Sequence, residues 1–299
     1  MGSIAHVVVV GGPPGLIDRA RRRLAELESL WSRFRPDSEI SRLNDRAGQF
    51  AAVSHETLML VQRAVDGHQL TGGMFDPTLL GAVRRAGYTV PFEQLKRAGA
   101  AAPESDDRRS GAAGIRFAPG LRVRLPEGVG FDPGGIGKGL AADMVCRELR
   151  RAGAAGACVN MGGDVRVSGE APDGDGWTIA VEHPARRSPV AVLGIGEGAV
   201  ASSTTLLRRW RTAGGSRHHL IDPRTGEPAQ PGAEFASVVT GDAWRAEVLA
   251  KAALLSGRRE AWRLLAAAGA EGLRVTARGR IEQTTGLDRY LGGVALPAA

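Results

Sequence analysis

The segment GFDPGGIGKGLAAD, residues 130–143, constrains the fold more than any other part of this sequence. It places a glycine-rich loop directly before an amphipathic helix, so backbone N–H groups and the positive end of a helix face the same point, as in phosphate sites. It does not match the nucleotide-binding P-loop. Asp132 stands where that motif has its first glycine, and Gly139 stands where it has a magnesium-binding hydroxyl. The segment therefore predicts a phosphate site of another kind.

Glycine-bounded strand patterns alternate with helical patterns along the rest of the chain. AHVVVVGG, residues 5–12, predicts a buried strand, and apolar residues at spacings of three and four predict an amphipathic helix between Leu16 and Phe34. A second helix is expected to begin at the cap residue Ser54, and LRVTARGRIEQT, residues 273–284, predicts a hairpin. This mixture of elements with glycine-rich junctions indicates an α+β fold.

The length of 299 residues is expected to give one domain, 1–299, which the sequence leaves free to divide into two lobes. The candidate boundary is the polar, small-residue segment 98–113, which is expected to be an exposed loop. A second interpretation concerns VVVVGGPPG, which precedes a helix as in dinucleotide-binding folds. The third glycine of that fingerprint is missing here, so this alternative is weak.

Charge and hydropathy argue against nucleic-acid and membrane partners. The net charge of +7 comes from 39 basic and 32 acidic residues, and much of the excess is arginine on helical faces without interleaved aromatic residues. The sequence has no apolar run long enough for a membrane helix and no signal-peptide pattern, so a cytoplasmic location is expected. Cys146 and Cys158 are expected to be two buried thiols, without a disulfide or a zinc site.

Seven loop motifs follow one another in order along the chain. Each is a weak signal alone, because a Gly-Asp junction is usually a turn. The motifs are FRPDSEISRLN (34–44), TGGMFDPT (71–78), FDPGGIGKGLAAD (131–143), VNMGGDV (159–165), ASST (201–204), HHLIDPRTGEP (218–228) and TGDAWRAEVLAKA (240–252). Together they resemble the FAD:protein FMN transferase family, also called ApbE-like, over nearly the whole chain. The resemblance implies the α+β, T-fold-like architecture of that family.

The resemblance also implies an enzyme that binds FAD with magnesium. Such an enzyme transfers the FMN half of FAD to a Thr or Ser hydroxyl of a target flavoprotein and releases AMP. Breaking a pyrophosphate requires cancelling phosphate charge, orienting the attacking hydroxyl and stabilising the leaving group. Two alternatives stay open: hydrolysis of FAD to FMN and AMP, and a non-catalytic FAD-binding protein.

The residues that match the family's FAD-contacting positions lie in three of the motifs. They are Met74, Phe75, Asp76, Asp132, Lys138 and His219, of which Asp132, Lys138 and His219 are expected to act in catalysis. Phe75 and Asp76 also fit a structural interpretation, with Phe75 in the core and Asp76 capping the next helix. Asp222 is expected to form a hydrogen-bonded turn, and Asn160 and Asp164 fit either a turn or a ligand contact.

The predicted metal site departs from the family pattern. In the family, magnesium is held by a backbone oxygen, here that of Gly135, and by an Asp and a Thr in a pattern like ADALAT, where this sequence has AEVLAK. Glu247 keeps an oxygen ligand, but Lys251 replaces the hydroxyl, and an ammonium group cannot ligate magnesium. Glu247 and Lys251 are therefore either a surface ion pair, four residues apart on a helix, or a site where the Lys251 charge substitutes in part for the metal.

Overall fold

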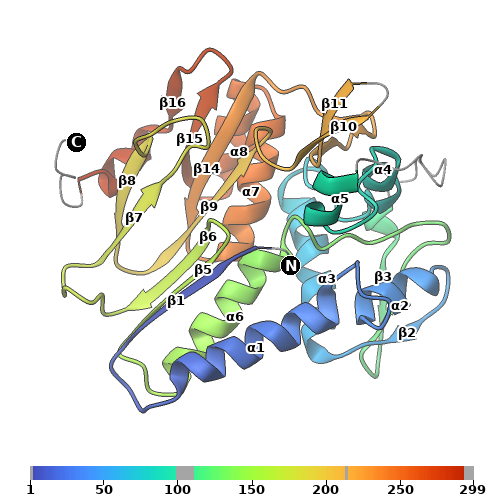
Figure 1. The fold of residues 1–299 in the computed structure, drawn as a ribbon, viewed down its shortest axis with the longest axis horizontal. Helices are drawn as coiled ribbons and strands as arrows, with labels where there is room; N and C mark the ends of the chain where they lie inside the picture. The colour runs from blue at the N-terminus through green and yellow to red at the C-terminus, as the bar shows by residue number, and fades with distance from the viewer. Residues whose placement is uncertain (1–2, 99–110, 213–214, 293–299) are drawn as a thin grey trace. The chain divides into compact units, whose positions relative to one another are not determined.

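The computed structural model describes residues 3–98, 111–212 and 215–292. Helices alternate with antiparallel sheets along the chain (Figure 1), so the α+β prediction is confirmed. The chain clusters into two compact units: a first unit with Ala25–Gly137 and Thr205–Pro231, and a second with Ser3–Leu24, Lys138–Thr204 and the chain from Gly232 onward. Most of the loop expected at 98–113 lies outside the described residues.

The second unit is built on a seven-stranded sheet. Its strands in spatial order are β1 (Ala5–Val10), β5 (Gly156–Met161), β6 (Asp164–Gly169), β9 (Gly198–Thr204), β14 (Ala233–Thr240), β15 (Glu271–Thr276) and β16 (Ile281–Gln283). Every neighbouring pair is antiparallel. The dinucleotide-binding interpretation of VVVVGGPPG is therefore wrong, because that fold needs parallel strands joined by crossover helices.

Strand β1 forms one edge of this sheet, beside β5 (Figure 1). The strand itself confirms the prediction from AHVVVVGG, but its expected burial is wrong: Val8 is 43% exposed. A β-branched run indicates an extended backbone, whereas burial depends on how many layers cover the strand. Within the described chain, β1 is an edge strand that pairs only with β5, so no strand of the sheet covers its other edge.

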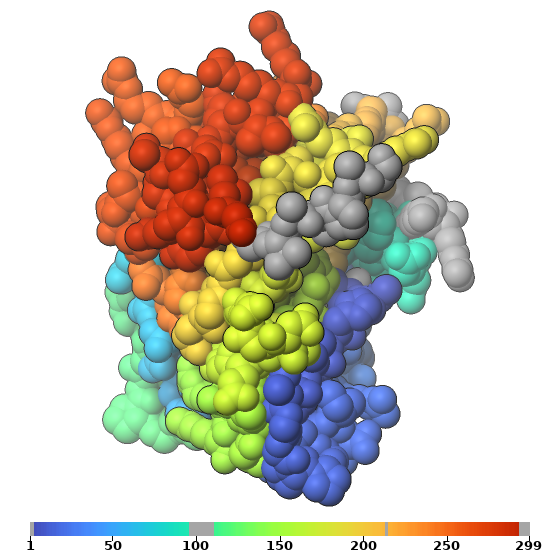
Figure 2. All heavy atoms as spheres, turned by 90° about the vertical axis from the view of Figure 1, so that its left-hand side faces the viewer, coloured from blue at the N-terminus to red at the C-terminus, as the bar shows by residue number. Residues whose placement is uncertain are grey.

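The central strands of the second unit are covered on both faces. Helix α7 (Ala243–Leu255) packs on β9 and β14, α8 (Arg258–Ala267) packs on α7 and β15, and Cys146 of α6 (Gly137–Arg151) lies 3.6 Å from a β5 carbonyl oxygen. The hairpin of β7 (Trp177–Val181) and β8 (Ala191–Ile195), with the 3-10 segment η2 (Thr285–Tyr290), encloses an apolar cluster around Phe235 and Leu287. Figure 2 shows the chain of β15, β16 and η2 in red beside the yellow hairpin.

The first unit consists of short helices and small antiparallel sheets. Its helical elements are the end of α1 (Leu16–Trp31), α2 (Glu39–Asp45), α3 (His55–Leu70), α4 (Leu80–Arg85), α5 (Phe92–Ala98) and the 3-10 turn η1 (Ala112–Gly114). Its strands are β2 (Ala51–Ala52), β3 (Arg116–Ala118), β4 (Arg122–Arg124), β10 (Arg209–Thr212), β11 (Gly215–His218), β12 (Ile221–Asp222) and β13 (Glu227–Pro228). Tyr88, Leu95 and Trp210 form its core together with residues of α4.

The predicted local elements occur where the sequence placed them. Helix α1 spans Leu16–Trp31 and ends three residues before Phe34, α3 begins directly after its N-cap Ser54, and β15 and β16 form the predicted hairpin. Cys146 and Cys158 are free thiols, buried and half-buried, and burial raises the pKa of Cys146 to about 12. Among the described residues, no helix combines the length and apolarity needed to cross a membrane.

Candidate functional site

The motif TGGMFDPT forms a tight turn at the end of α3 in the first unit. The Thr71 hydroxyl donates to a carbonyl oxygen in the last turn of α3 (2.8 Å) and accepts from the Phe75 N–H (3.0 Å). Gly72 and Gly73 have φ values of 57° and 86°, a left-handed backbone that favours glycine. The turn buries Phe75 and Met74, which are 1% and 8% exposed. The core interpretation of Phe75 is therefore confirmed, while its contact with FAD stays a prediction.

Asp76 is held by its own loop. Its Oδ1 accepts hydrogen bonds from the Thr78 N–H (2.7 Å) and the Thr78 hydroxyl, and that hydroxyl accepts from the Gly111 N–H (2.8 Å). The N-cap of α4 is Leu79, without a side-chain hydrogen bond. The prediction that Asp76 caps the next helix is wrong, because its carboxylate turns to Thr78 two residues ahead.

The structure brings this turn and the glycine-rich loop together within the first unit. The Asp132 N–H donates to the Pro77 carbonyl oxygen (2.7 Å), and Leu79 and Gly130 form an isolated parallel bridge. A Cβ atom at Gly130 would lie 2.9 Å from Leu80 Cδ2 and 3.0 Å from Leu80 Cβ, so a larger residue here would have to displace the Leu80 side chain. The predicted FAD contacts at Asp76 and Asp132 thus lie on adjoining loops.

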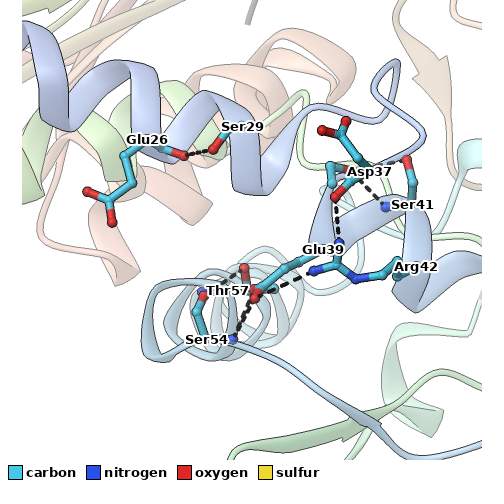
Figure 3. Close-up of polar contacts among 9 residues, drawn as sticks. Glu26, Ser29, Asp37, Glu39, Ser41, Arg42, Ser54 and Thr57 are labelled. Carbon is cyan, nitrogen blue, oxygen red and sulfur yellow. Dashed lines mark hydrogen bonds and ion pairs between the residues drawn. The ribbon is translucent and has the colours of Figure 1, made fainter.

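The motif FRPDSEISRLN forms the supporting structure drawn in Figure 3. Ser38 caps α2 by accepting from the Ser41 N–H (3.0 Å). The Glu39 carboxylate accepts from both the N–H (2.9 Å) and the hydroxyl (2.7 Å) of Ser54, and Ser54 caps α3 through the Thr57 N–H (3.1 Å). Two helix N-termini are thereby satisfied by one connected set of side chains.

The last residue of that motif reaches the glycine-rich loop. Asn44 Nδ2 donates to the Phe131 carbonyl oxygen (3.0 Å), and Asn44 Oδ1 accepts from the Phe131 N–H (2.7 Å). A side-chain amide can satisfy both groups of one residue because it carries a donor and an acceptor side by side. This clamp fixes the backbone immediately before Asp132.

The Asp132 carboxylate is itself held on both oxygens. Its Oδ1 accepts from the Gly134 N–H (2.8 Å), and its Oδ2 lies 3.4 Å from Nε of Arg33. Sequence reasoning did not select Arg33, because an arginine next to a basic helix is indistinguishable from a solvated charge. In the structure Arg33 pairs with Asp132. Its positive charge compensates the negative charge of this carboxylate, which would otherwise repel a phosphate bound at the loop.

Lys138 is the first residue of the Lys138–Thr204 segment of the second unit and lies against two acidic side chains. Its ammonium group forms ion pairs with Asp164 Oδ2 and with Glu247 Oε1, the latter at 3.1 Å. Both carboxylates are buried, with side chains 1% and 5% exposed. Burial raises the pKa of Asp164, and the Lys138 charge opposes that rise. The surface interpretation of Glu247 is therefore wrong, since this side chain faces the interior and the glycine-rich segment.

Helices α6 and α7 are joined at the same place. Glu247 Oε2 accepts from the Gly139 N–H (2.8 Å), and a Cβ atom at Gly139 would lie 2.4 Å from the Ala243 carbonyl oxygen. Asp143 of α6 accepts from the first two N–H groups of α7, those of Ala243 (2.8 Å) and Trp244 (2.9 Å). Burial raises the pKa of Asp143 to about 7, while these two N–H groups favour its charged form. Gly139, which excluded a P-loop, is required for this contact.

The residues present fit a magnesium ion poorly. Both Glu247 oxygens already meet donors, Lys138 Nζ and the Gly139 N–H. One carboxylate oxygen is still open to a ligand: Asp164 Oδ1 is buried and has no hydrogen-bond partner in the described part of the chain. Within that part, no group of three or more His, Cys, Asp or Glu side chains is arranged to hold a metal.

His219 lies half-buried between β11 and β12 in the first unit. Its neighbour His218 is buried and bonds to the Ala229 carbonyl oxygen (2.9 Å) and the Leu220 N–H (3.3 Å), which assigns His218 Nε2 as the protonated nitrogen. Asp222 accepts from the Arg224 N–H (2.9 Å) and guanidinium, and these bonds hold the pKa of Asp222 below its usual value. The predicted turn at Asp222 is confirmed, with the Gly226 N–H donating to the Asp222 carbonyl oxygen (2.8 Å).

The motif VNMGGDV forms the β5–β6 hairpin of the second unit. Asn160 Oδ1 accepts from the Gly163 N–H (2.8 Å), and Gly162 and Gly163 have φ values of 66° and 101°, as a two-residue hairpin turn requires. The turn interpretation of Asn160 is confirmed. Asp164 follows the turn and is carried to Lys138, so one short motif supplies both the turn and the ion pair.

Comparison with known proteins identifies the family. The sequence matches the ApbE family over residues 1–274. A Vibrio cholerae protein named FAD:protein FMN transferase is 30% identical over 247 residues, which cover 79% of this chain and 72% of that protein. A protein of the same name from Treponema pallidum is 27% identical over 261 residues, 81% of this chain and 71% of the relative.

The solved structures agree with the sequence comparison. The crystal structure of the ApbE protein from Thermotoga maritima superposes with a TM-score of 0.87 at 26% identity, covering 98% of this chain and 97% of that one. The flavin transferase ApbE from Vibrio cholerae gives a TM-score of 0.81 at 26% identity, with 97% and 96% covered. The resemblance predicted from the seven motifs is confirmed in sequence and in fold. This chain belongs to the ApbE family.

Proposed function

We propose that this chain transfers the FMN half of FAD to a Thr or Ser hydroxyl of an acceptor flavoprotein. The acceptor oxygen attacks the FMN phosphorus, the bond from that phosphorus to the AMP phosphate breaks, and AMP leaves. The hydroxyl proton passes to a base on the enzyme. The observation that carries the proposal is the joining of the TGGMFDPT turn to the Asp132 loop, in a member of the ApbE family.

Each predicted site residue has a role in this scheme. Met74, Phe75 and Asp76 bind FAD from the turn after α3, and Asp132 binds it from the adjoining loop. Lys138 is assigned to the pyrophosphate, to which its ammonium would bring positive charge in exchange for part of its pairing with Asp164 and Glu247. His219 accepts the hydroxyl proton or orients the phosphate, and it lies three residues before the Asp222 turn.

Whether FAD binding by this chain depends on magnesium is a separate part of the proposal, to be tested by measuring FAD affinity with and without EDTA. The family resemblance assigns the metal to Glu247 and the Gly135 carbonyl, but both Glu247 oxygens already meet donors, so no step of the proposed reaction uses a metal. Lys251 lies one helical turn beyond Glu247 on α7, where its charge would reduce the need for a metal. We expect FAD affinity to change less with EDTA in the wild type than in Lys251→Thr. Equal, strong magnesium dependence in both proteins would contradict this role of Lys251.

The transfer reaction is tested by incubating the protein with FAD and magnesium, with and without an acceptor flavoprotein domain. AMP release and a fluorescent acceptor band on a denaturing gel are followed together. We expect both only with the acceptor present, and a rate lower by about 10²–10⁴-fold in His219→Asn. His55→Asn, which changes an exposed histidine at the start of α3, is the matched control.

Two other outcomes would replace this function. AMP released without acceptor would identify an FAD pyrophosphatase, and intact FAD bound in both tubes would identify a non-catalytic binder. Replacing the acceptor's Thr or Ser by Ala tests the linkage itself. The cytoplasmic location expected from the sequence stays a prediction, which cell fractionation would test.

A further inference from the structure

We propose that Arg33 is a positioning residue that sets the orientation and charge of Asp132 for FAD. This inference rests on the proposed function, in which Asp132 contacts FAD. Arg33 lies two residues after α1 and outside all seven motifs. Nothing in its sequence context distinguishes it from the other arginines of this region.

Arg33 is a buried cation with an assigned counterion. Its side chain is 6% exposed, its Nη1 and Nη2 both donate to the Tyr88 carbonyl oxygen (3.1 Å each), and its Nε lies 3.4 Å from Asp132 Oδ2. A guanidinium keeps its charge in proteins, so its burial depends on a compensating carboxylate. Asp132 supplies that carboxylate.

The guanidinium of Arg33 is also held in place by aromatic rings. Its central carbon lies 4.2 Å from the ring centre of Phe34 and 4.7 Å from that of Tyr88. Tyr88 packs in turn on Trp210, with ring centres 5.5 Å apart. Arg33 is therefore the fixed partner in the pair, and it decides where the Asp132 carboxylate lies.

Asp132 connects this fixed cation to the loop backbone. One of its oxygens faces Arg33, the other accepts from the Gly134 N–H, and its own N–H donates to Pro77. Without Arg33 the carboxylate would carry an uncompensated charge beside a pyrophosphate, which repels it. Lysine cannot replace arginine here, because an ammonium lacks the planar fork that stacks on rings and donates in two directions.

A double-mutant cycle tests this role. FAD dissociation constants are measured by equilibrium dialysis for the wild type, Arg33→Met, Asp132→Asn and the double variant, together with kcat and KM for AMP release. We expect Arg33→Met to weaken FAD binding by about tenfold when Asp132 is present and by less than about twofold when it is added to Asp132→Asn. Arg63→Met, which removes an exposed arginine paired with Asp66, is the control and should leave FAD affinity unchanged.

Each outcome decides the proposal. An equal loss of affinity from Arg33→Met with and without Asp132→Asn, or no loss in Asp132→Asn alone, overturns it, because Arg33 would then act on the fold and not through Asp132. If Arg33→Met does not fold, Arg33→Lys replaces it: weakened FAD binding by a folded protein supports the proposal, and wild-type affinity overturns it. A wild type that binds FAD without transferring FMN contradicts the proposed function but leaves this cycle measurable.

Discussion

Asp132 and Asp164 are each paired with a cation, but the two pairs lie in different surroundings. Asp132 in the first unit is 17% exposed and lies on a loop. One of its carboxylate oxygens accepts from the Gly134 N–H, and the other faces Arg33. Asp164 in the second unit is 1% exposed, follows a hairpin turn and shares Lys138 with Glu247. Asp132 lies on a loop beside the proposed FAD contacts, whereas the Lys138–Asp164–Glu247 cluster is a fixed part of the core. Substitutions in the Arg33–Asp132 pair should therefore change FAD affinity. Substitutions in the Lys138–Asp164–Glu247 cluster should change both FAD affinity and the free energy of unfolding.

The largest effect is expected from Lys138→Met. It leaves Asp164 and Glu247 buried together without their cation, so the free energy of unfolding should fall by about 3–5 kcal/mol. Chemical denaturation measures this loss. The variant Lys138→Met/Asp164→Asn removes one of the two charges and should recover part of it. A loss below about 1 kcal/mol would show that the buried cluster contributes no more than an exposed ion pair does.

Asp143→Asn should change how stability depends on pH. The pKa of Asp143 is raised to about 7 in the folded protein from 3.8, so the folded state binds the proton more tightly than the unfolded state does. Stability should therefore fall as pH rises from about 4 to about 7, by at most about 4 kcal/mol for this group. We expect Asp143→Asn to flatten that part of the curve, measured by denaturation at each pH. Asp66→Asn, at an exposed pair on α3, should leave the slope as it is.

Asn44→Ala tests the loop half of the comparison. It removes both hydrogen bonds to Phe131 and leaves that N–H and C=O without the amide, at a cost of about 1–3 kcal/mol. Because the clamped backbone precedes Asp132, FAD affinity should fall together with stability. Isothermal titration with FAD and a denaturation curve on the same sample separate the two effects. Lost stability with wild-type FAD affinity would show that the loop forms its site without this clamp.

The smallest effect is expected from Ser54→Ala, at the cap of α3. It removes the acceptor for the Thr57 N–H and one hydroxyl from Glu39, which should cost about 1 kcal/mol. Thermal unfolding measures the change, and Ser54→Asp should retain most of the cap while opposing Glu39. A change in FAD affinity with Ser54→Ala would extend the functional part of the first unit into its supporting helices.

The sequence predicted helices, strands and turns better than it predicted which of them are buried. Helices α1 and α3, the β15–β16 hairpin and the turns at Asn160 and Asp222 follow from periodicity, caps and glycine positions, which act within a few residues. The burial of β1 did not follow, because the same β-branched run suits a central strand and an edge strand. The motif order predicted the family, since seven weak signals in one order are far more specific than any of them alone.

By itself the sequence determined which residues carry charge, which backbone positions need glycine, and where the chain turns. Tertiary structure alone decided which charges meet: Arg33 with Asp132, Lys138 with both Asp164 and Glu247, and Asp143 with the start of α7. The partners in these contacts lie 26 to 109 residues apart along the chain. Local propensity carries no information over such separations, because the partners come together only when the sheets and helices have packed.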